Sequence, residues 1–172
     1  MTLFRPATPL MVQYAHYHRD RRNIATHLVG IPLITWSIGV LLLGPSWTVA
    51  GHELTLAGCL WALTSLWYLS RGDLLLGAAT TLVNGAVIAL AHQVPPWAAA
   101  WGLPVWQAGL GLFVIGWVFQ FVGHYFEGRK PAFVDDLVGL LVGPMFVVGE
   151  LLMGLGVLQK MRRDIERQAG PS

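Results

Sequence analysis

The chain has 172 residues, of which 55% are hydrophobic and only 12% are charged, where ordinary soluble domains have about 25% charged residues. So few polar groups exclude a soluble globular fold, and the surplus of apolar residues excludes intrinsic disorder. A single cysteine excludes a disulfide scaffold. The net charge of +2 lies in short basic clusters between apolar runs, a pattern that argues against a nucleic-acid partner and is typical of a membrane protein.

Four apolar runs are long enough to cross about 30 Å of hydrocarbon. They cover residues 24–49, 54–70, 74–91 and 103–122. The first run follows several arginines and resembles the opening of a signal peptide, but it is too long and lacks a small-residue cleavage site. We therefore expect it to be retained as a transmembrane helix.

A fifth apolar segment, residues 137–158, contains Gly143-Pro144 near its centre and Glu150 beyond them. Because proline interrupts the helical hydrogen-bond ladder, this segment is predicted to form two half-helices in a hairpin or an interfacial layer. Asp135 or Asp136 is expected to cap its start.

The predicted fold is therefore an all-α, polytopic integral membrane protein with four transmembrane helices plus a broken or re-entrant C-terminal helical segment. We expect residues 1–172 to form a single membrane domain. Its parts are an N-terminal segment (1–23), the four spans (24–122), a motif loop with the broken helix (123–158) and a basic tail (159–172).

The basic residues predict the orientation in the membrane. With four spans and a fifth segment that does not cross, all eleven Lys and Arg residues lie on one side, which the positive-inside rule assigns to the cytoplasm. Both termini are then cytoplasmic, whereas a crossing fifth segment would place the basic C-terminus outside. We expect the bacterial inner membrane, or the endoplasmic reticulum if the source is a eukaryote.

Polar residues near the predicted cytoplasmic boundary form two groups. The first group comprises His16, His18, Asn23 and His27; the second comprises His124, Glu127, Arg129, Asp135, Asp136 and Glu150. Because the first span leaves the cytoplasmic side and the fourth returns to it, the two groups are expected to meet. Six histidines without a thiolate cluster favour imidazole and oxygen ligation of iron, copper or zinc.

Spacing constrains this metal hypothesis. Asn23 and His27 share a helix face, as do His124 and Glu127. His18 and His27 would lie on opposite faces of an unbroken helix. If both bind one metal, the helix must begin near Asn23, a good N-cap residue, with His18 folding in from the preceding segment.

Charged residues outside the histidine group leave alternatives open. A carboxylate such as Glu150 in an apolar run is costly in lipid, so we expect it to be functional or to have a charged partner. Arg129 and Lys130 could bind a substrate carboxylate, or they could only follow the charge rule.

Two motifs in these segments resemble a known family. Tyr14, His18, Asn23, His27 and Gly30-Ile31-Pro32 stand in the pattern Y-x-x-x-H-x-x-x-x-N-x-x-x-H-x-x-G-I-P, and Q-F-V-G-H-x-F-E-x-R-K-P-A-F begins at position 120. Together with D-D-L and G-P-x-F-V-x-x-E further on, these motifs resemble those of the membrane-bound 2-hydroxy fatty acid dioxygenase family. The resemblance extends from about residue 10 to residue 155.

This resemblance implies an Fe(II)-dependent α-oxidation that uses dioxygen as co-substrate and shortens a 2-hydroxy fatty acid by one carbon. It predicts that His18, His27 and His124 hold the iron. Glu127 or Glu150 would complete the ligand set or orient a ligand histidine, and with Asn23 they are the predicted catalytic residues. Arg129 or Lys130 would attract the substrate carboxylate from the bilayer surface.

Two other classes of protein remain as alternatives. A membrane hydroxylase or desaturase with two irons would need a larger set of histidines at short spacing, which the sequence lacks. A non-enzymatic transporter or channel would account for Gly143-Pro144 and Glu150, but the predicted spans hold almost no ionisable groups to line a pathway. A metal-binding membrane protein without enzymatic activity is also left open.

Overall fold

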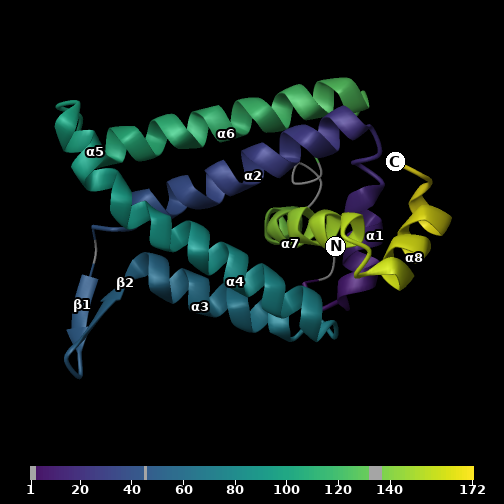
Figure 1. The fold of residues 1–172 in the computed structure, drawn as a ribbon, viewed down its shortest axis with the longest axis horizontal. Coiled ribbons are helices and arrows are strands. Elements are labelled where there is room, and N and C mark those ends of the chain that lie inside the picture. The colour runs from purple at the N-terminus through teal and green to yellow at the C-terminus, as the bar shows by residue number, and fades with distance from the viewer. Residues whose placement is uncertain (1–2, 45, 132–136) are drawn as a thin grey trace.

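The computed structural model describes residues 3–44, 46–131 and 137–172, leaving aside the side chains of residues 52 and 53. The predicted cap at Asp135 or Asp136 lies outside these residues. In chain order the elements are α1 (Ala7–Ala15), α2 (Arg21–Leu41), β1 (Ser46–Val49), β2 (His52–Thr55), α3 (Leu56–Leu69), α4 (Leu74–Leu90), the short 3₁₀ helix η1 (Ala91–Gln93), α5 (Val94–Ala100), α6 (Val105–Glu127), α7 (Val138–Gly154) and α8 (Gln159–Ala169) (Figure 1).

The all-α polytopic membrane fold is confirmed. Among the described residues, three helical stretches are long and apolar enough to span a membrane: Arg21–Leu41, Leu74–Ala100 and Val105–Glu127. These correspond to three of the four predicted spans. The remaining one, α3, has 14 residues and reaches only about 21 Å at 1.5 Å per residue, although it runs alongside α4.

A β-hairpin replaces the end of the first predicted span and the start of the second. The helix α2 ends at Leu41 instead of continuing to residue 49, and β1 pairs with β2 in an antiparallel ladder. Ala50 and Gly51 both have positive φ, the backbone that a two-residue hairpin turn requires. Apolar composition alone could not distinguish this exposed hairpin from a longer span.

The C-terminal helical segment is bent, as predicted, but the break does not lie at Gly143-Pro144. The helix α7 continues through Pro144, and the chain bends by 112° between α7 and α8. At that bend Val157 donates its backbone N–H to Leu152 and Gly156 donates to Met153, with Gly156 at positive φ, which is the hydrogen-bond pattern of a glycine C-cap. Proline is tolerated within α7 because the surrounding helices hold this segment in place.

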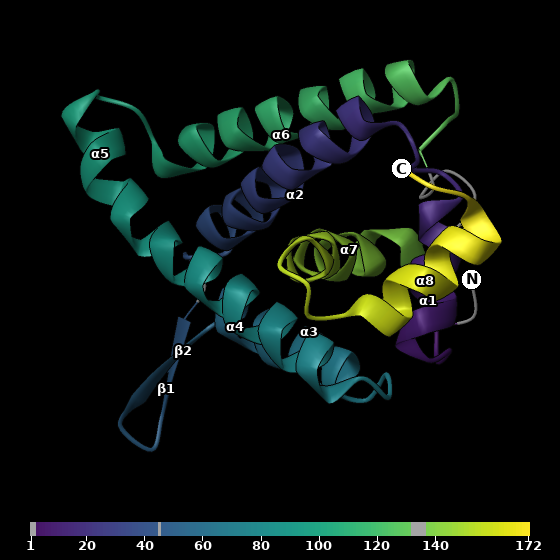
Figure 2. The same ribbon diagram turned by 45° about the vertical axis from the view of Figure 1, so that its right-hand side comes forward.

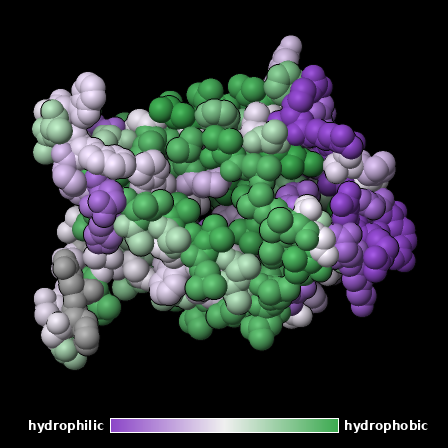
Figure 3. All heavy atoms as spheres, viewed as in Figure 1, coloured by the Kyte–Doolittle hydropathy of each residue, from purple (hydrophilic) through white to green (hydrophobic). Residues whose placement is uncertain are grey.

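The helices surround α7, whose residues are buried on most sides by α1, α2, α4 and α8 (Figures 1 and 2). A hydrophobic band covers the middle of the molecule, and hydrophilic residues gather at the end formed by α8 and the neighbouring turns (Figure 3). The basic segments meet at this end: Ala7 donates its backbone N–H to Arg71, and Arg129 donates to His16. Its assignment to the cytoplasm stays a prediction.

Candidate metal centre

His18, His27 and His124 meet at this polar end, as the predicted order of the spans requires. One ring nitrogen from each lies within 4.8 Å of the corresponding nitrogens of the other two, and the side chains are only 0%, 1% and 5% exposed. His18 comes from the turn between α1 and α2, His27 from the second turn of α2, and His124 from the last turn of α6. The structure therefore brings together three imidazoles from sequence-distant segments that could hold one metal ion.

The hydrogen bonds of the Nδ1 atoms determine the tautomers of His18 and His27. His18 Nδ1 lies 2.8 Å from the Tyr14 carbonyl oxygen, and His27 Nδ1 lies 2.9 Å from the Asn23 carbonyl oxygen. A carbonyl oxygen can only accept, so both Nδ1 atoms must carry the proton and donate it. In neutral imidazoles both Nε2 atoms then present bare lone pairs.

These two Nε2 atoms nevertheless face each other at 3.0 Å. Lone pairs at this distance repel, whereas a cation placed between them would bind both. His124 Nδ1 is also buried and has no hydrogen-bond partner in the part of the chain that the structure describes. Burial, followed by the neighbouring His27 imidazole, holds the pKa of His18 well below its usual value, which keeps it in the neutral form that binds metals. The donor set suits iron, copper or zinc.

The start of α2 differs from the prediction. Asp20, rather than Asn23, is the N-cap residue, and its side chain accepts a hydrogen bond from the Arg22 backbone N–H. The helix therefore begins at Arg21, three residues earlier than an Asn23 cap would place it. His18 still lies outside the helix and folds in from the preceding turn, so the geometric requirement for a shared site is met.

Glu127 and Asn23 hold the turn that carries His18. The Glu127 carboxylate accepts hydrogen bonds from the backbone N–H groups of Arg19, at 3.0 Å, and of Asp20, at 2.9 Å. The Asn23 amide donates to the same carboxylate at 2.9 Å and to the Tyr17 carbonyl at 3.1 Å. These contacts lie beside the histidine cluster and connect the end of α6 to the turn before α2. The two side chains are thus placed to position His18 through the backbone.

The side chains of the other predicted site residues lie apart from the three clustered histidines. Glu150 borders a separate polar cavity of about 140 Å³ together with Arg19 and Arg162. Arg129 is exposed and donates to the His16 carbonyl, and Lys130 is also exposed. Neither basic residue lines the cavity beside the histidine cluster.

Glycines allow α2 and α6 to approach closely enough to bring His27 and His124 together. A Cβ atom added at Gly116 would lie 2.7 Å from an Ile34 side-chain carbon and 3.0 Å from the Gly30 carbonyl oxygen. One added at Gly123 would collide with Thr26 and Asn23. Small residues at such contacts are a common way to pack helices in membranes, where burial of apolar surface does not drive association.

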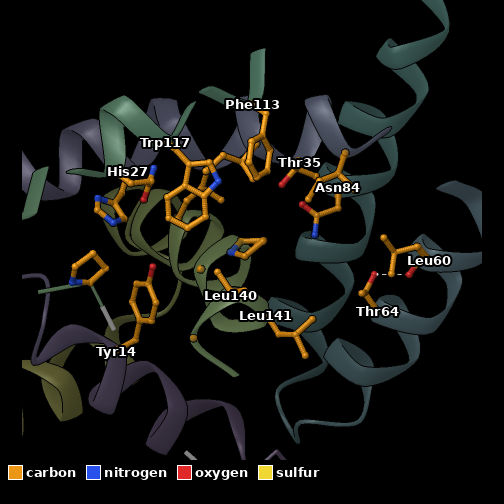
Figure 4. Close-up of a pocket in the computed structure, with 18 of the residues that line it drawn as sticks. Tyr14, His27, Thr35, Leu60, Thr64, Asn84, Phe113, Trp117, Leu140 and Leu141 are labelled. Atoms are coloured by element: carbon orange, nitrogen blue, oxygen red, sulfur yellow. Dashed lines mark hydrogen bonds between the residues drawn. The ribbon is translucent and has the colours of Figure 1, made fainter. Parts of the chain in front are cut away.

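A cavity of about 320 Å³ begins at the histidine cluster and extends between the helices. Figure 4 shows His27 and Tyr14 at one end, and Leu60 and Thr64 at the other. Its lining is mostly apolar, with contributions from α2, α3, α4, α6 and α7, including Ile34, Trp61, Phe113 and Trp117. The helices α3 and α6 form opposite walls, but each packs mainly on another helix, α4 or α2, within the described residues. Within the described residues, α3 and α6 therefore do not pack extensively on each other on this side of the cavity.

Sequence reasoning did not single out several polar residues that line this cavity. Tyr14 stacks on His18 with ring centroids 4.1 Å apart and nearly parallel planes, and Asn84 and Thr35 lie farther along (Figure 4). The only signal for Asn84 was an amide within an apolar run. Tyr14 stood in the first motif four residues before His18, but nothing in its spacing distinguished an orienting residue from a packing one.

Comparisons with known proteins point to one family. A family model described as "2-hydroxy-palmitic acid dioxygenase Mpo1-like" matches residues 4–155. The chain is 34% identical over 159 residues to the 2-hydroxy-palmitic acid dioxygenase MPO1 of Saccharomyces cerevisiae, covering 89% of this chain and 83% of the yeast protein. No solved structure matches.

Proposed function

The chain belongs to the Mpo1-like family, and from this premise we propose that it is an Fe(II)-dependent dioxygenase that shortens 2-hydroxy fatty acids by one carbon. In the overall balance, the 2-hydroxy acid and dioxygen give the acid with one carbon fewer, carbon dioxide and water. The bond between C1 and C2 breaks, and C2 becomes the new carboxyl carbon. The facing Nε2 atoms of His18 and His27 are the observation that carries this proposal.

His18, His27 and His124 are the residues that would hold the iron, since their bare nitrogens converge at the end of the cavity. Iron(II) bound there would supply the one-electron chemistry that activates dioxygen. Glu127 and Asn23 support the site by fixing the turn that carries His18. Glu150 would act at a distance. Its carboxylate borders the same small cavity as the guanidinium of Arg19, which lies in the turn that carries His18.

The cavity supports a fatty acyl substrate. Its mostly apolar lining would bury the hydrocarbon chain, which is favourable by about 0.8 kcal/mol for each buried CH₂ group. With the carboxyl end at the histidines, the chain would point toward Leu60 and Thr64. We propose that the substrate enters sideways from the bilayer between α3 and α6. Arg129 and Lys130, at the polar end, would attract the carboxylate electrostatically without contacting it in the bound state.

The proposal is tested with protein purified in detergent under conditions that retain iron. Elemental analysis measures the bound metal, and mass spectrometry measures the acid formed from 2-hydroxypalmitic acid in the presence of dioxygen. We expect iron in the wild-type protein and in His16→Ala, whose imidazole is exposed, and the acid shortened by one carbon as product. His27→Ala should lose both iron and product. Iron without product would instead indicate a metal-binding membrane protein, and absence of metal would refute the proposal.

A further inference from the structure

Tyr14 lies between the histidine cluster and the cavity. Its ring is stacked on the His18 imidazole, it packs against Phe146 with centroids 4.9 Å apart, and its carbonyl oxygen accepts the hydrogen bond from His18 Nδ1. Figure 4 shows the hydroxyl of this side chain turned into the cavity, at the same end as His27. The backbone and ring of Tyr14 thus orient a predicted ligand, while its hydroxyl faces the space beside the cluster.

The hydroxyl of Tyr14 has no hydrogen-bond partner among the residues that the structure describes, although the side chain is only 5% exposed. Tyr68 offers a direct comparison in the same cavity, because its equally buried hydroxyl donates to the Leu141 carbonyl at 3.1 Å. Buried hydroxyl groups are nearly always hydrogen-bonded, so one that faces a cavity without a protein partner is free to bond whatever occupies that cavity, ligand or water.

Gly143 leaves space around this hydroxyl. A Cβ atom added at Gly143 would lie 3.3 Å from the Tyr14 hydroxyl oxygen and 3.1 Å from the Ile31 Cδ1 atom, closer than most packed side chains approach. Because position 143 has no side chain, a small group can sit next to the hydroxyl without displacing α1 or α7.

We propose that the Tyr14 hydroxyl binds the substrate carboxylate by donating a hydrogen bond to it inside the cavity. This inference rests on the proposed function, since it takes a 2-hydroxy fatty acid as the ligand. A neutral donor is well suited to this place, because it binds an anion without adding a positive charge beside three imidazoles that must stay neutral. The exposed Arg129, which donates to the His16 carbonyl, leaves this direct contact to Tyr14.

The test is equilibrium binding in the absence of dioxygen, so that no turnover occurs. The probes are 2-hydroxypalmitic acid and hexadecane-1,2-diol, which keeps the tail and the 2-hydroxyl but has no carboxylate. A hydrogen bond to a charged group contributes enough that Tyr14→Phe should weaken binding of the acid by roughly 10- to 100-fold. Binding of the diol should change by no more than a few-fold, and iron content should stay at the wild-type level because the ring and the residue 14 carbonyl remain.

Tyr68→Phe is the matched control, because it removes a buried hydroxyl that already has a protein acceptor; it should keep the preference for the acid over the diol. Gly143→Ala approaches the same hydroxyl from the other side and should also weaken binding of the acid selectively, which keeps the test decisive if Tyr14→Phe does not fold. Equal binding of the acid by the wild-type protein, Tyr14→Phe and Gly143→Ala would overturn the inference and leave the proposed function standing. A wild-type protein that binds the acid with the Tyr14 dependence, yet forms no product, would support the inference and refute the proposed reaction.

Discussion

Replacing Glu127 with glutamine should loosen the turn that carries His18 without emptying the space around it. In the wild-type protein the carboxylate accepts hydrogen bonds from three donors, namely the backbone N–H groups of Arg19 and Asp20 and the Asn23 amide. One oxygen of Glu127, Oε2, bonds all three, whereas Oε1 bonds only the Arg19 N–H. A glutamine can place its oxygen at Oε2, but its NH₂ group then faces the Arg19 N–H, so a donor meets a donor.

The magnitude follows from this loss. The glutamine NH₂ group would be a part-buried donor without a good acceptor, which lowers the free energy of unfolding by about 1–3 kcal/mol. The loss of the negative charge near the start of α2 lowers it by about a few tenths of a kcal/mol more. We take about 1–2 kcal/mol, because Glu127 is partly exposed to solvent. For a chain of this size that change lowers the melting temperature by roughly 2–8 °C. Because hydrogen bonds from surrounding residues hold metal ligands in place, the affinity for the metal should fall by about 10- to 100-fold.

The assay combines thermal unfolding in detergent with retention of iron against increasing chelator. Asp20→Asn is the matched control: it removes one carboxylate charge from the same turn, but that carboxylate forms a surface ion pair with Arg22 at 2.7 Å. Exposed pairs of this kind contribute little to stability, and asparagine can still cap the helix. If Glu127→Gln retained iron as strongly as Asp20→Asn and melted at the same temperature, the reasoning that Glu127 positions His18 would be refuted.

Three further predictions concern the same region. Alanine at any one of the three clustered histidines should remove bound iron, whereas His16→Ala and the exposed His92→Ala should retain it, as elemental analysis would show. Gly123→Ala should destabilise the contact between α2 and α6 by about 1–3 kcal/mol in thermal unfolding, while Gly111→Ala on the same helix, with nothing within 4 Å of the new methyl group, should be neutral or slightly stabilising. Because burial lowers the pKa of His18, the unfolded chain takes up a proton below about pH 6.5 that the folded chain does not. The metal-free protein should therefore lose stability as the pH falls through that value. A melting temperature independent of pH between about 7 and 5 would contradict this.

The sequence was sufficient to predict the membrane fold and the meeting of the histidines. Apolar runs long enough to cross a bilayer are rare in water-soluble folds, and the four predicted passes return His124 to the level of His18 and His27. The local spacing also required that His18 lie outside the helix. These predictions depend on composition and periodicity, which the sequence displays directly.

Details that depend on distant partners could not be predicted. The helix α2 starts at Arg21 because the Asp20 side chain caps it, while Asn23, an equally good cap residue, bonds Glu127 and the Tyr17 carbonyl instead. Similarly, Pro144 lies within a helix supported by its neighbours, and the bend comes at Gly156, where positive φ closes a C-cap. Both Pro144 and Gly156 can end a helix, and only the packing of the surrounding helices determines which of them does.

Arg19 contacts Glu127 and the C-terminal segment, and it borders the same small cavity as Glu150. Its backbone N–H bonds Glu127, its guanidinium donates to the His18 carbonyl and, at 2.7 Å, to the Gly170 carbonyl, and it borders the cavity that contains Glu150. The charge pattern alone describes residues 159–172 as a tail on the cytoplasmic side, but α8 packs on α1 and brings Gly170 to the turn next to His18. We therefore expect the Glu150 carboxylate to affect function without touching the substrate. Glu150 offsets the charge of the arginine that connects the last residues of the chain to the first predicted metal ligand, so changes at either end of this connection should reach the metal centre through His18.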